Sequence, residues 1–160
     1  MDFTYRVDKR DDVDHIFFSG KINEDSEAPL NDLSSQLAQK VVFNFAAIKM
    51  INSCGVRAWI TFLRDAQKSR DITFEECPPE IVSQVNMIPN FLGHAKIKSV
   101  YAEYSCANCG HSKWRMFEKG KDLPESSKAI HISEFKCEKC QEPMEMEEIE
   151  DEFFSFIKEI

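Results

Sequence analysis

The chain has 160 residues, 42% of them hydrophobic, and its 20 Lys and Arg against 28 Asp and Glu leave a net charge of -8 at pH 7. This length allows one full hydrophobic core with a small module attached, since domains of about 100–150 residues are the commonest. The acidic balance disfavours binding to phosphate backbones or to anionic lipid through bulk electrostatics.

The first residues, MDFTYRVDKRDDVD, lack the apolar core of a signal peptide. The longest mostly apolar stretch, residues 41–51, is interrupted by Asn44 and Lys49 and is much shorter than the roughly 20 residues that cross a bilayer. The sequence therefore predicts a soluble, cytoplasmic protein with no membrane contact. In that reducing compartment, its six cysteines are expected as free thiols or metal ligands rather than disulfides.

The first half of the chain alternates strand-like and helix-like patterns. Residues 3–7 alternate apolar and polar side chains, residues 14–20 form a second apolar run, and the charged segment between them predicts a hairpin. Leucines at helical spacing predict a short helix over residues 30–37. The apolar run at 40–48 predicts a central strand covered on both faces.

The same alternation continues to residue 104. Apolar side chains recur at helical spacing over 56–66, and residues 71–76 resemble a strand. Pro78 and Pro79 suit the first turn of a further helix, and residues 95–104 alternate as one strand. This order predicts an α/β fold, a mixed β-sheet with helices packed on it.

The composition changes after Tyr104, which predicts three parts: residues 1–103, a module at 104–145, and a terminal segment at 146–160. The terminal segment places Ile149, Phe153, Phe156 or Ile157, and Ile160 on one stripe with acidic residues opposite. We therefore expect a C-terminal amphipathic helix that packs back on the first part, because its phenylalanines would otherwise stay exposed.

Four cysteines form two C-x-x-C pairs, Cys106 with Cys109 and Cys137 with Cys140. Two such turns can direct four thiolates at one tetrahedral ion, which favours a single structural Zn²⁺. Iron in a rubredoxin-like site and a redox dithiol pair are the alternatives. Four thiolates leave no open position for water, which argues against a catalytic zinc. The nearby His111 is interpreted as a surface histidine.

The four-cysteine module resembles a zinc ribbon over about residues 104–145. Its charges are balanced, with seven basic and seven acidic residues between 101 and 142. Trp114 and Phe117 could stack on bases, but an aromatic strand beside a metal site is more often its miniature core. The module is therefore predicted to be a scaffold or a protein contact. A nucleic-acid-binding transcription accessory and a thiol or metal sensor are the alternative functions.

Two motifs in the first hundred residues resemble one known family. Residues 17–23, FFSGKIN, are similar to a strand ending in Gly that is followed by an apolar and an acidic or amide position. Residues 41–63 are similar to a strand and short loop followed by a D-S-x-G motif that opens a long helix. In this order the motifs resemble the STAS domain, which sulfate transporters and bacterial anti-sigma factor antagonists share. The resemblance covers about residues 1–100 and implies a STAS-like fold.

In phosphoregulated members of that family, the serine after the aspartate is the target of a partner kinase that also acts as anti-sigma factor. By position this serine is Ser53. The resemblance therefore implies a non-enzymatic bacterial signalling protein of anti-sigma factor antagonist type. Its partner, a serine kinase or anti-sigma factor, is expected to bind the surface around Asn52, Ser53, Gly55 and Arg57.

Ser53 has two competing interpretations. A helix N-terminus accommodates a phosphoryl group, which adds about -1.5 to -2 charge and would alter docking of a partner. Alternatively, Ser53 is the N-cap, worth ~1 kcal/mol, and Gly55 only makes the turn tight. The amides of Asn44 and Asn52, where the family often has aspartates, weaken the phosphorylation hypothesis.

Two further cysteines lie in the first part. Cys54 near a helix N-terminus could be a reactive thiol, but no convincing base accompanies it, so a small buried thiol is predicted. Cys77 precedes two prolines and is interpreted as structural. No catalytic residue is assigned.

Overall fold

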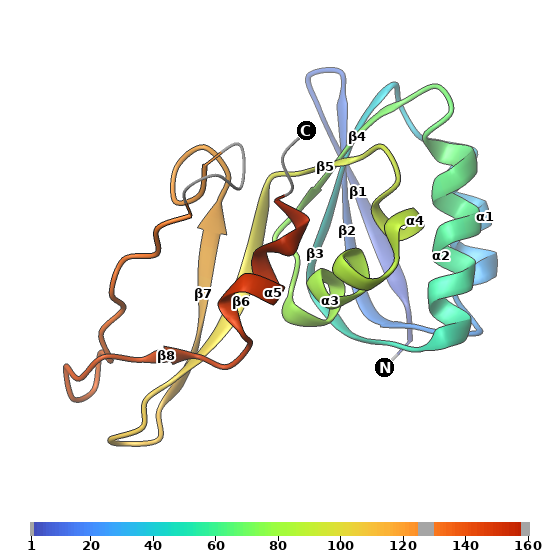
Figure 1. Ribbon diagram of the computed structural model, residues 1–160. Helices are drawn as coiled ribbons and strands as arrows, with labels where there is room; N and C mark the ends of the chain where they lie inside the picture. Colours follow the sequence, from blue (N-terminus) through green and yellow to red (C-terminus); the bar gives the residue numbers. More distant parts are fainter. Residues whose placement is uncertain (1, 125–129, 158–160) are drawn as a thin grey trace.

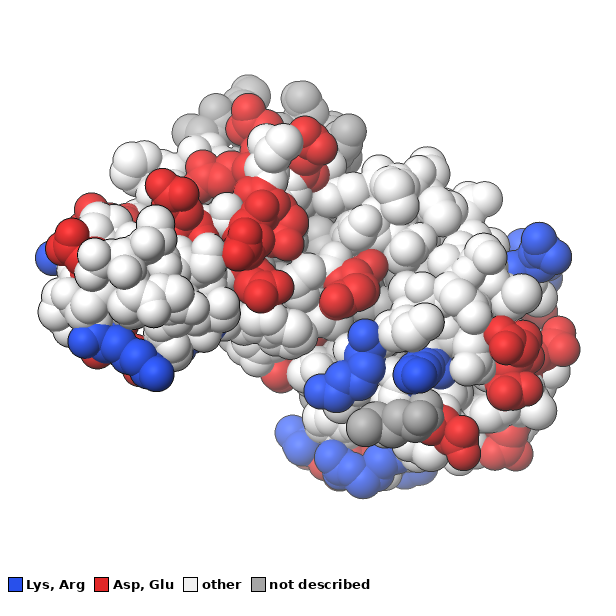
Figure 2. Space-filling model, turned by 90° about the horizontal axis from the view of Figure 1, so that it is seen from below, with Lys and Arg blue, Asp and Glu red and all other residues white. Residues whose placement is uncertain are grey.

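The computed structural model describes residues 2–124 and 130–157, which form two lobes (Figure 1). The larger lobe contains a five-stranded sheet, and the smaller lobe a three-stranded sheet. Figure 2 shows the surface from below, where Asp and Glu side chains gather in the left-centre of the view. The chain is thus a mixed α/β protein, as its alternating pattern predicted.

The larger sheet has the order β1-β2-β3-β4-β5. Its strands are β1 (Thr4–Arg10), β2 (Val13–Ile22), β3 (Lys40–Ile51), β4 (Asp71–Glu75) and β5 (Lys96–Ile97). The expected hairpin forms, since β1 and β2 are antiparallel, and the other neighbours are parallel. The sheet is therefore mixed, with an antiparallel edge strand.

The connections between the parallel strands are helical. They are α1 (Glu27–Ser34), α2 (Ser53–Ala66), α3 (Pro79–Met87) and the single turn α4 (Pro89–Leu92). α1 begins earlier than the predicted residue 30, and its Leu30 and Leu33 are buried. α2 and α3 begin where the sequence indicated, α3 with a proline in its first turn.

Trp59 of α2 forms the centre of the larger lobe's core. Its ring centroid lies 5.4–5.7 Å from those of four phenylalanines of the sheet, Phe18, Phe43, Phe45 and Phe74. Its indole Nε1 donates a 3.0 Å hydrogen bond to the carbonyl of Phe91 in α4. Burying each such side chain stabilises the fold by about 1.5–3 kcal/mol, so these contacts hold α2 and α4 on one face of the sheet.

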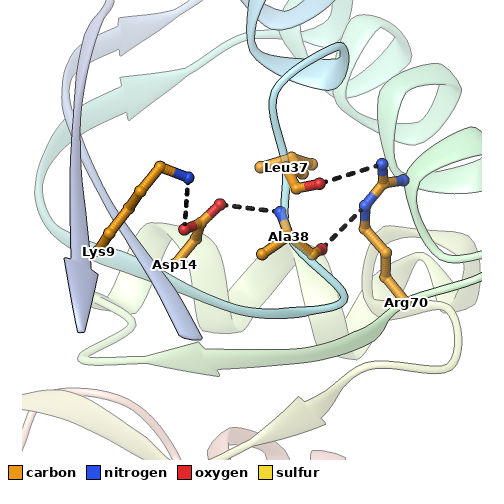
Figure 3. A network of polar contacts seen from close by, with 5 residues as sticks. All are labelled: Lys9, Asp14, Leu37, Ala38 and Arg70. Carbon is orange, nitrogen blue, oxygen red and sulfur yellow. Dashed lines mark hydrogen bonds and ion pairs between the residues drawn. The ribbon is translucent and has the colours of Figure 1, made fainter. Parts of the chain in front are cut away.

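A polar network lies at the end of the sheet where β3 begins (Figure 3). The buried carboxylate of Asp14 accepts hydrogen bonds from Lys9 Nζ at 3.0 Å and from the backbone N–H of Ala38 at 2.8 Å. The guanidinium of Arg70 donates to the carbonyls of Ala38 and Leu37. The partly buried backbone of Leu37 and Ala38, between α1 and β3, thereby finds hydrogen-bond partners, since an unpaired polar group costs about 1–3 kcal/mol when it is buried.

The strand expected over residues 95–104 is divided between the two lobes, which corrects that prediction. β5 ends at Ile97, and the N–H of Lys98 donates to the carbonyl of Phe74 at 2.8 Å. β6 (Ser99–Ser105) then pairs antiparallel with β7 (Ser112–Glu118) and β8 (Glu145–Met146). Because alternation is the same in both sheets, it does not mark where the chain passes from one to the other. The expected boundary after residue 103 lies within β6.

Cys77 joins the two lobes. Its N–H donates to the carbonyl of Ser99 at 3.1 Å, and its carbonyl accepts from the N–H of Tyr101 at 2.8 Å. The side chain is completely buried, which raises the pKa of its thiol. The structural interpretation of Cys77 is consistent with this position.

The C-terminal segment does not form one continuous helix over its described residues. It forms β8, the single turn α5 (Glu150–Phe153) and the 3-10 turn η2 (Phe154–Phe156), and the predicted stripe position Ile160 lies outside the described residues. Ile149 is 64% exposed, so it does not belong to the buried stripe. The side chains that are buried here are those of Phe153, Phe154 and Ile157.

The terminal segment nevertheless packs back on the larger lobe. The side-chain Nδ2 of Asn86 in α3 donates to the carbonyls of Glu152 and Phe153 at 3.1 and 3.0 Å. The ring of Phe154 meets that of Phe117 in β7 edge to face, with centroids 5.1 Å apart. The segment is therefore held by both lobes.

Candidate functional site

Asn52 follows the last residue of β3 and caps α2. Its Oδ1 accepts a 2.8 Å hydrogen bond from the N–H of Gly55, and its backbone N–H donates to the carbonyl of Ile22 at 3.1 Å. Its Nδ2 donates to Oε2 of Glu24 at 3.0 Å, which lowers the pKa of that exposed carboxyl. The cap thus connects the start of α2 to the loop after β2.

Ser53 is the first residue of α2, and its side chain is exposed. Because Asn52 occupies the cap position, the N-cap interpretation of Ser53 is wrong. Arg57, four residues further along, is exposed on the same side of the helix. Cys54 is exposed as well, which corrects the prediction of a buried thiol. A serine hydroxyl, a thiol and a guanidinium therefore face solvent on the first two turns.

Gly55 is buried where α2 passes over the end of β2. A Cβ at this position would lie 2.1 Å from the carbonyl oxygen of Ile22 and 2.9 Å from the nitrogen of Asn23. Glycine is required because no other residue allows this approach. Of the four residues predicted for the partner surface, Ser53 and Arg57 are exposed, Asn52 is partly covered, and Gly55 supports them from beneath.

Asn44 lies within β3, opposite Glu75 at the carboxyl end of β4, and is 5% exposed. Its Nδ2 donates to the carboxylates of Glu75 and Glu76, each at 2.9 Å, and its Oδ1 accepts from the N–H of Ala46. An aspartate here would place a third negative charge against two others. The two glutamates therefore give a physical reason for the amide.

Tyr101 completes this polar cluster, which the sequence analysis missed. Its hydroxyl donates to Oε1 of Glu76 at 3.0 Å, and burial together with that bond raises the pKa of Tyr101 to about 12. Two adjacent glutamates at a strand end were the available signal. Their amide and phenol partners come from β3 and β6, which no local pattern indicates.

The four cysteines of the two C-x-x-C pairs converge on one point in the smaller lobe. Their sulfurs all lie within 4.8 Å of one another, with 3.5 Å between Cys106 and Cys140 and 3.6 Å between Cys109 and Cys137. A tetrahedral Zn²⁺ with bonds of 2.3 Å requires sulfurs about 3.8 Å apart. All four thiols are free, so the donor set and its spacing fit such an ion.

The two cysteine turns have the same backbone structure. In each, the N–H of the first cysteine bonds to the carbonyl five residues later, and its carbonyl accepts from the N–H four residues later, at 2.8–2.9 Å. The residue after each second cysteine is left-handed, Gly110 with φ 80° and Gln141 with φ 67°. This repeated geometry directs both pairs of sulfurs toward the same point.

The thiol of Cys140 ionises more readily than an ordinary cysteine. Hydrogen bonds from the Asn108 side chain and from the backbone of Glu142 lower its pKa to about 6. Cys140 is therefore largely thiolate at neutral pH, the form that binds a metal.

The other polar and aromatic residues of the smaller lobe lie outside the cysteine cluster. His111 Nε2 is 3.2 Å from Oε1 of Glu138. Trp114 is 40% exposed, whereas Phe117 is buried and unavailable to bases. Arg115 donates to Ser133 and stacks over the Phe117 ring, which holds its guanidinium within the lobe.

No family model and no curated protein matches the sequence. Among solved structures, the chain is similar to an anti-sigma factor antagonist from Mycobacterium paratuberculosis, with 17% identity and a TM-score of 0.42, over 49% of this chain and 71% of that one. No helix in the described residues combines the length and the apolar character needed to cross a membrane.

Proposed function

We propose that this chain is a non-enzymatic regulatory protein that binds a protein partner through the surface at the start of α2. The observation that carries the proposal is the exposed side chain of Ser53 at the first position of a 14-residue helix, with Asn52 as the cap. The surface comprises Asn52, Ser53 and Arg57, supported by Gly55. Its partner is a serine kinase or anti-sigma-type protein.

Phosphorylation of Ser53 switches this interaction. A phosphoryl group at this position meets the free N–H groups and the positive end of the helix dipole. Arg57 lies one turn further along the same side, where a guanidinium pairs well with phosphate. The added charge changes the surface that a partner contacts without disturbing Asn52, which already holds the cap.

The four cysteines hold one structural Zn²⁺ that orders the smaller lobe. The closeness of the four sulfurs and the matching backbone of the two turns support this role. Bound zinc would supply the crosslink between the β6-β7 hairpin and the chain that leads into β8. Metal analysis of the full chain tests it: one equivalent of zinc is expected, lost in Cys109→Ser and kept in Cys54→Ser. Bound iron, or an isolated metal-free protein with stable disulfides, would contradict it.

The partner surface is tested by affinity capture with the full chain as bait, followed by titration of the captured partner in purified form. We expect Ser53→Asp to weaken binding by at least about tenfold, equivalent to about 1.4 kcal/mol. Ser69→Asp, an exposed serine beyond the other end of α2, is the matched control and should bind normally. Mass spectrometry of the chain after incubation with that partner and ATP should find phosphate on Ser53. Equal binding by the wild type, Ser53→Asp and Ser53→Ala would refute the switch.

A further inference from the structure

An apolar groove lies between α3 and the C-terminal segment. Its volume is about 390 Å³, and its lining includes Pro79 and Met87 from α3 with Ile149 and Phe153 from the segment. Met87 and Ile149 are 65% and 64% exposed, the two highest values among the large hydrophobic side chains of the described residues. Two such side chains at one groove indicate a contact surface rather than scattered exposure.

Two hydrogen-bond acceptors at this groove have no donor. In the described part of the chain, Oδ1 of Asn86 and Oε1 of Glu148 are the buried side-chain polar atoms without a partner, and both residues line the groove. The orientation of Asn86 is determined by its Nδ2, which donates to the carbonyls of Glu152 and Phe153. Its Oδ1 therefore accepts nothing within the chain. Buried acceptors of this kind are normally satisfied.

The charge beside the groove is of one sign. Residues 145–152 contain six acidic side chains and no Lys or Arg, and three of the six, Glu147, Glu148 and Glu152, line the groove. Figure 2 shows the wider surface, in which Asp and Glu gather next to uncharged side chains. An occupant must therefore combine an apolar side chain with positively charged donors.

We propose that this groove docks a basic, amphipathic segment of a protein partner. An apolar side chain of that segment packs between Met87 and Ile149, and flanking Lys or Arg groups pair with the exposed carboxylates of Glu147 and Glu152 at the rim. Burial of the two exposed apolar side chains supplies affinity, and the acidic rim supplies preference for a basic sequence. This surface is built on α3 and α5 and does not depend on the proposed function of the α2 surface (Figure 1).

The test uses the full chain and a fluorescein-labelled peptide of 14 residues in which pairs of Leu and Lys alternate as an amphipathic helix. Fluorescence anisotropy in about 50 mM salt measures its affinity, because higher ionic strength screens surface charge. Ile149→Lys and Met87→Lys should each weaken binding by at least about tenfold, and Glu152→Gln by severalfold. A peptide with Ser in place of Leu, which keeps every charge, should bind much less tightly.

Matched controls separate the groove from general attraction to an acidic protein. Met50→Lys changes another exposed methionine, and Glu27→Gln removes an exposed charge on α1; both should bind the peptide within about twofold of the wild type. Amide shifts on titration with unlabelled peptide should concentrate at residues 79–87 and 147–153. Absence of binding, equal losses in the controls, or shifts centred elsewhere would overturn the proposal.

Discussion

The N–H of Gly55 donates a 2.8 Å hydrogen bond to Oδ1 of Asn52. Because of this bond, the structural role at the start of α2 belongs to Asn52, and the proposed functional role belongs to Ser53. Asn52 holds the helix end, Gly55 allows it to approach β2, and the Ser53 side chain extends into solvent. The surface can therefore change chemically without loss of the helix.

Substitution of the cap tests this division directly. Asn52→Ala should lower the free energy of unfolding by about 1 kcal/mol, because the N–H of Gly55 loses its acceptor. Ser53→Ala should change it by less than about 0.5 kcal/mol. Urea unfolding followed by tryptophan fluorescence measures both. The reverse order of the two losses would mean that Ser53 holds the helix end.

Asn44 and Asn52 should respond differently to substitution by Asp. Asn44→Asp removes two N–H donors and places a carboxylate against Glu75 and Glu76. We therefore expect the free energy of unfolding at pH 7 to fall by about 1–3 kcal/mol or more. Asn52→Asp keeps an effective cap and should cost less than about 1 kcal/mol.

The loss in Asn44→Asp should also depend on pH. Neighbouring carboxylates favour the protonated form of the introduced group in the native chain, so its pKa is higher there than in the unfolded chain. The destabilisation is then complete above the folded pKa and diminishes as the pH falls toward about 4. Urea midpoints relative to the wild type at several pH values give this measurement. A constant difference would exclude charge repulsion as the cause.

Gln141→Gly should stabilise the second cysteine turn. Gln141 has φ 67°, the conformation that glycine adopts at the equivalent Gly110. A non-glycine residue is strained in this conformation, and a glycine would not be, although glycine is also more flexible in the unfolded chain. The net effect should raise the free energy of unfolding by up to about 1 kcal/mol. Zinc affinity measured by chelator competition should rise up to about fivefold. Lys139→Gly, within the same turn, is the control and should not raise it.

Glu148→Gln should stabilise the chain at neutral pH. Burial raises the pKa of Glu148; backbone hydrogen bonds partly oppose this effect, and the nearby charges of Glu103 and Glu147 add a smaller increase. The native chain therefore holds this proton more tightly than the unfolded chain, and stability falls as the pH rises through the folded pKa. The urea midpoint of Glu148→Gln should exceed that of the wild type at pH 7 and approach it near pH 4. Glu147→Gln, an exposed neighbour, should show no comparable gain.

The sequence determined most of the secondary structure of the larger lobe and the members of the cysteine cluster. The hairpin, the parallel strands and α2 follow from periodicity and from Gly and Pro positions, which depend on residues a few positions apart. The C-x-x-C spacing predicted the four clustered sulfurs because each turn positions its own pair. The terminal helix was predicted less well, since Phe153, Phe154 and Ile157 are buried by two lobes rather than along one helical stripe.

Only the tertiary structure decided which residues meet. It placed Asn44 between Glu75 and Glu76, showed that Gly55 is required by the carbonyl of Ile22, and brought α3 beside the acidic C-terminal segment. These contacts join residues about 30 to 70 positions apart, and their geometry depends on strand register and helix packing. Side-chain patterns within each segment do not encode that register, because the same alternation fits several pairings until one core is filled.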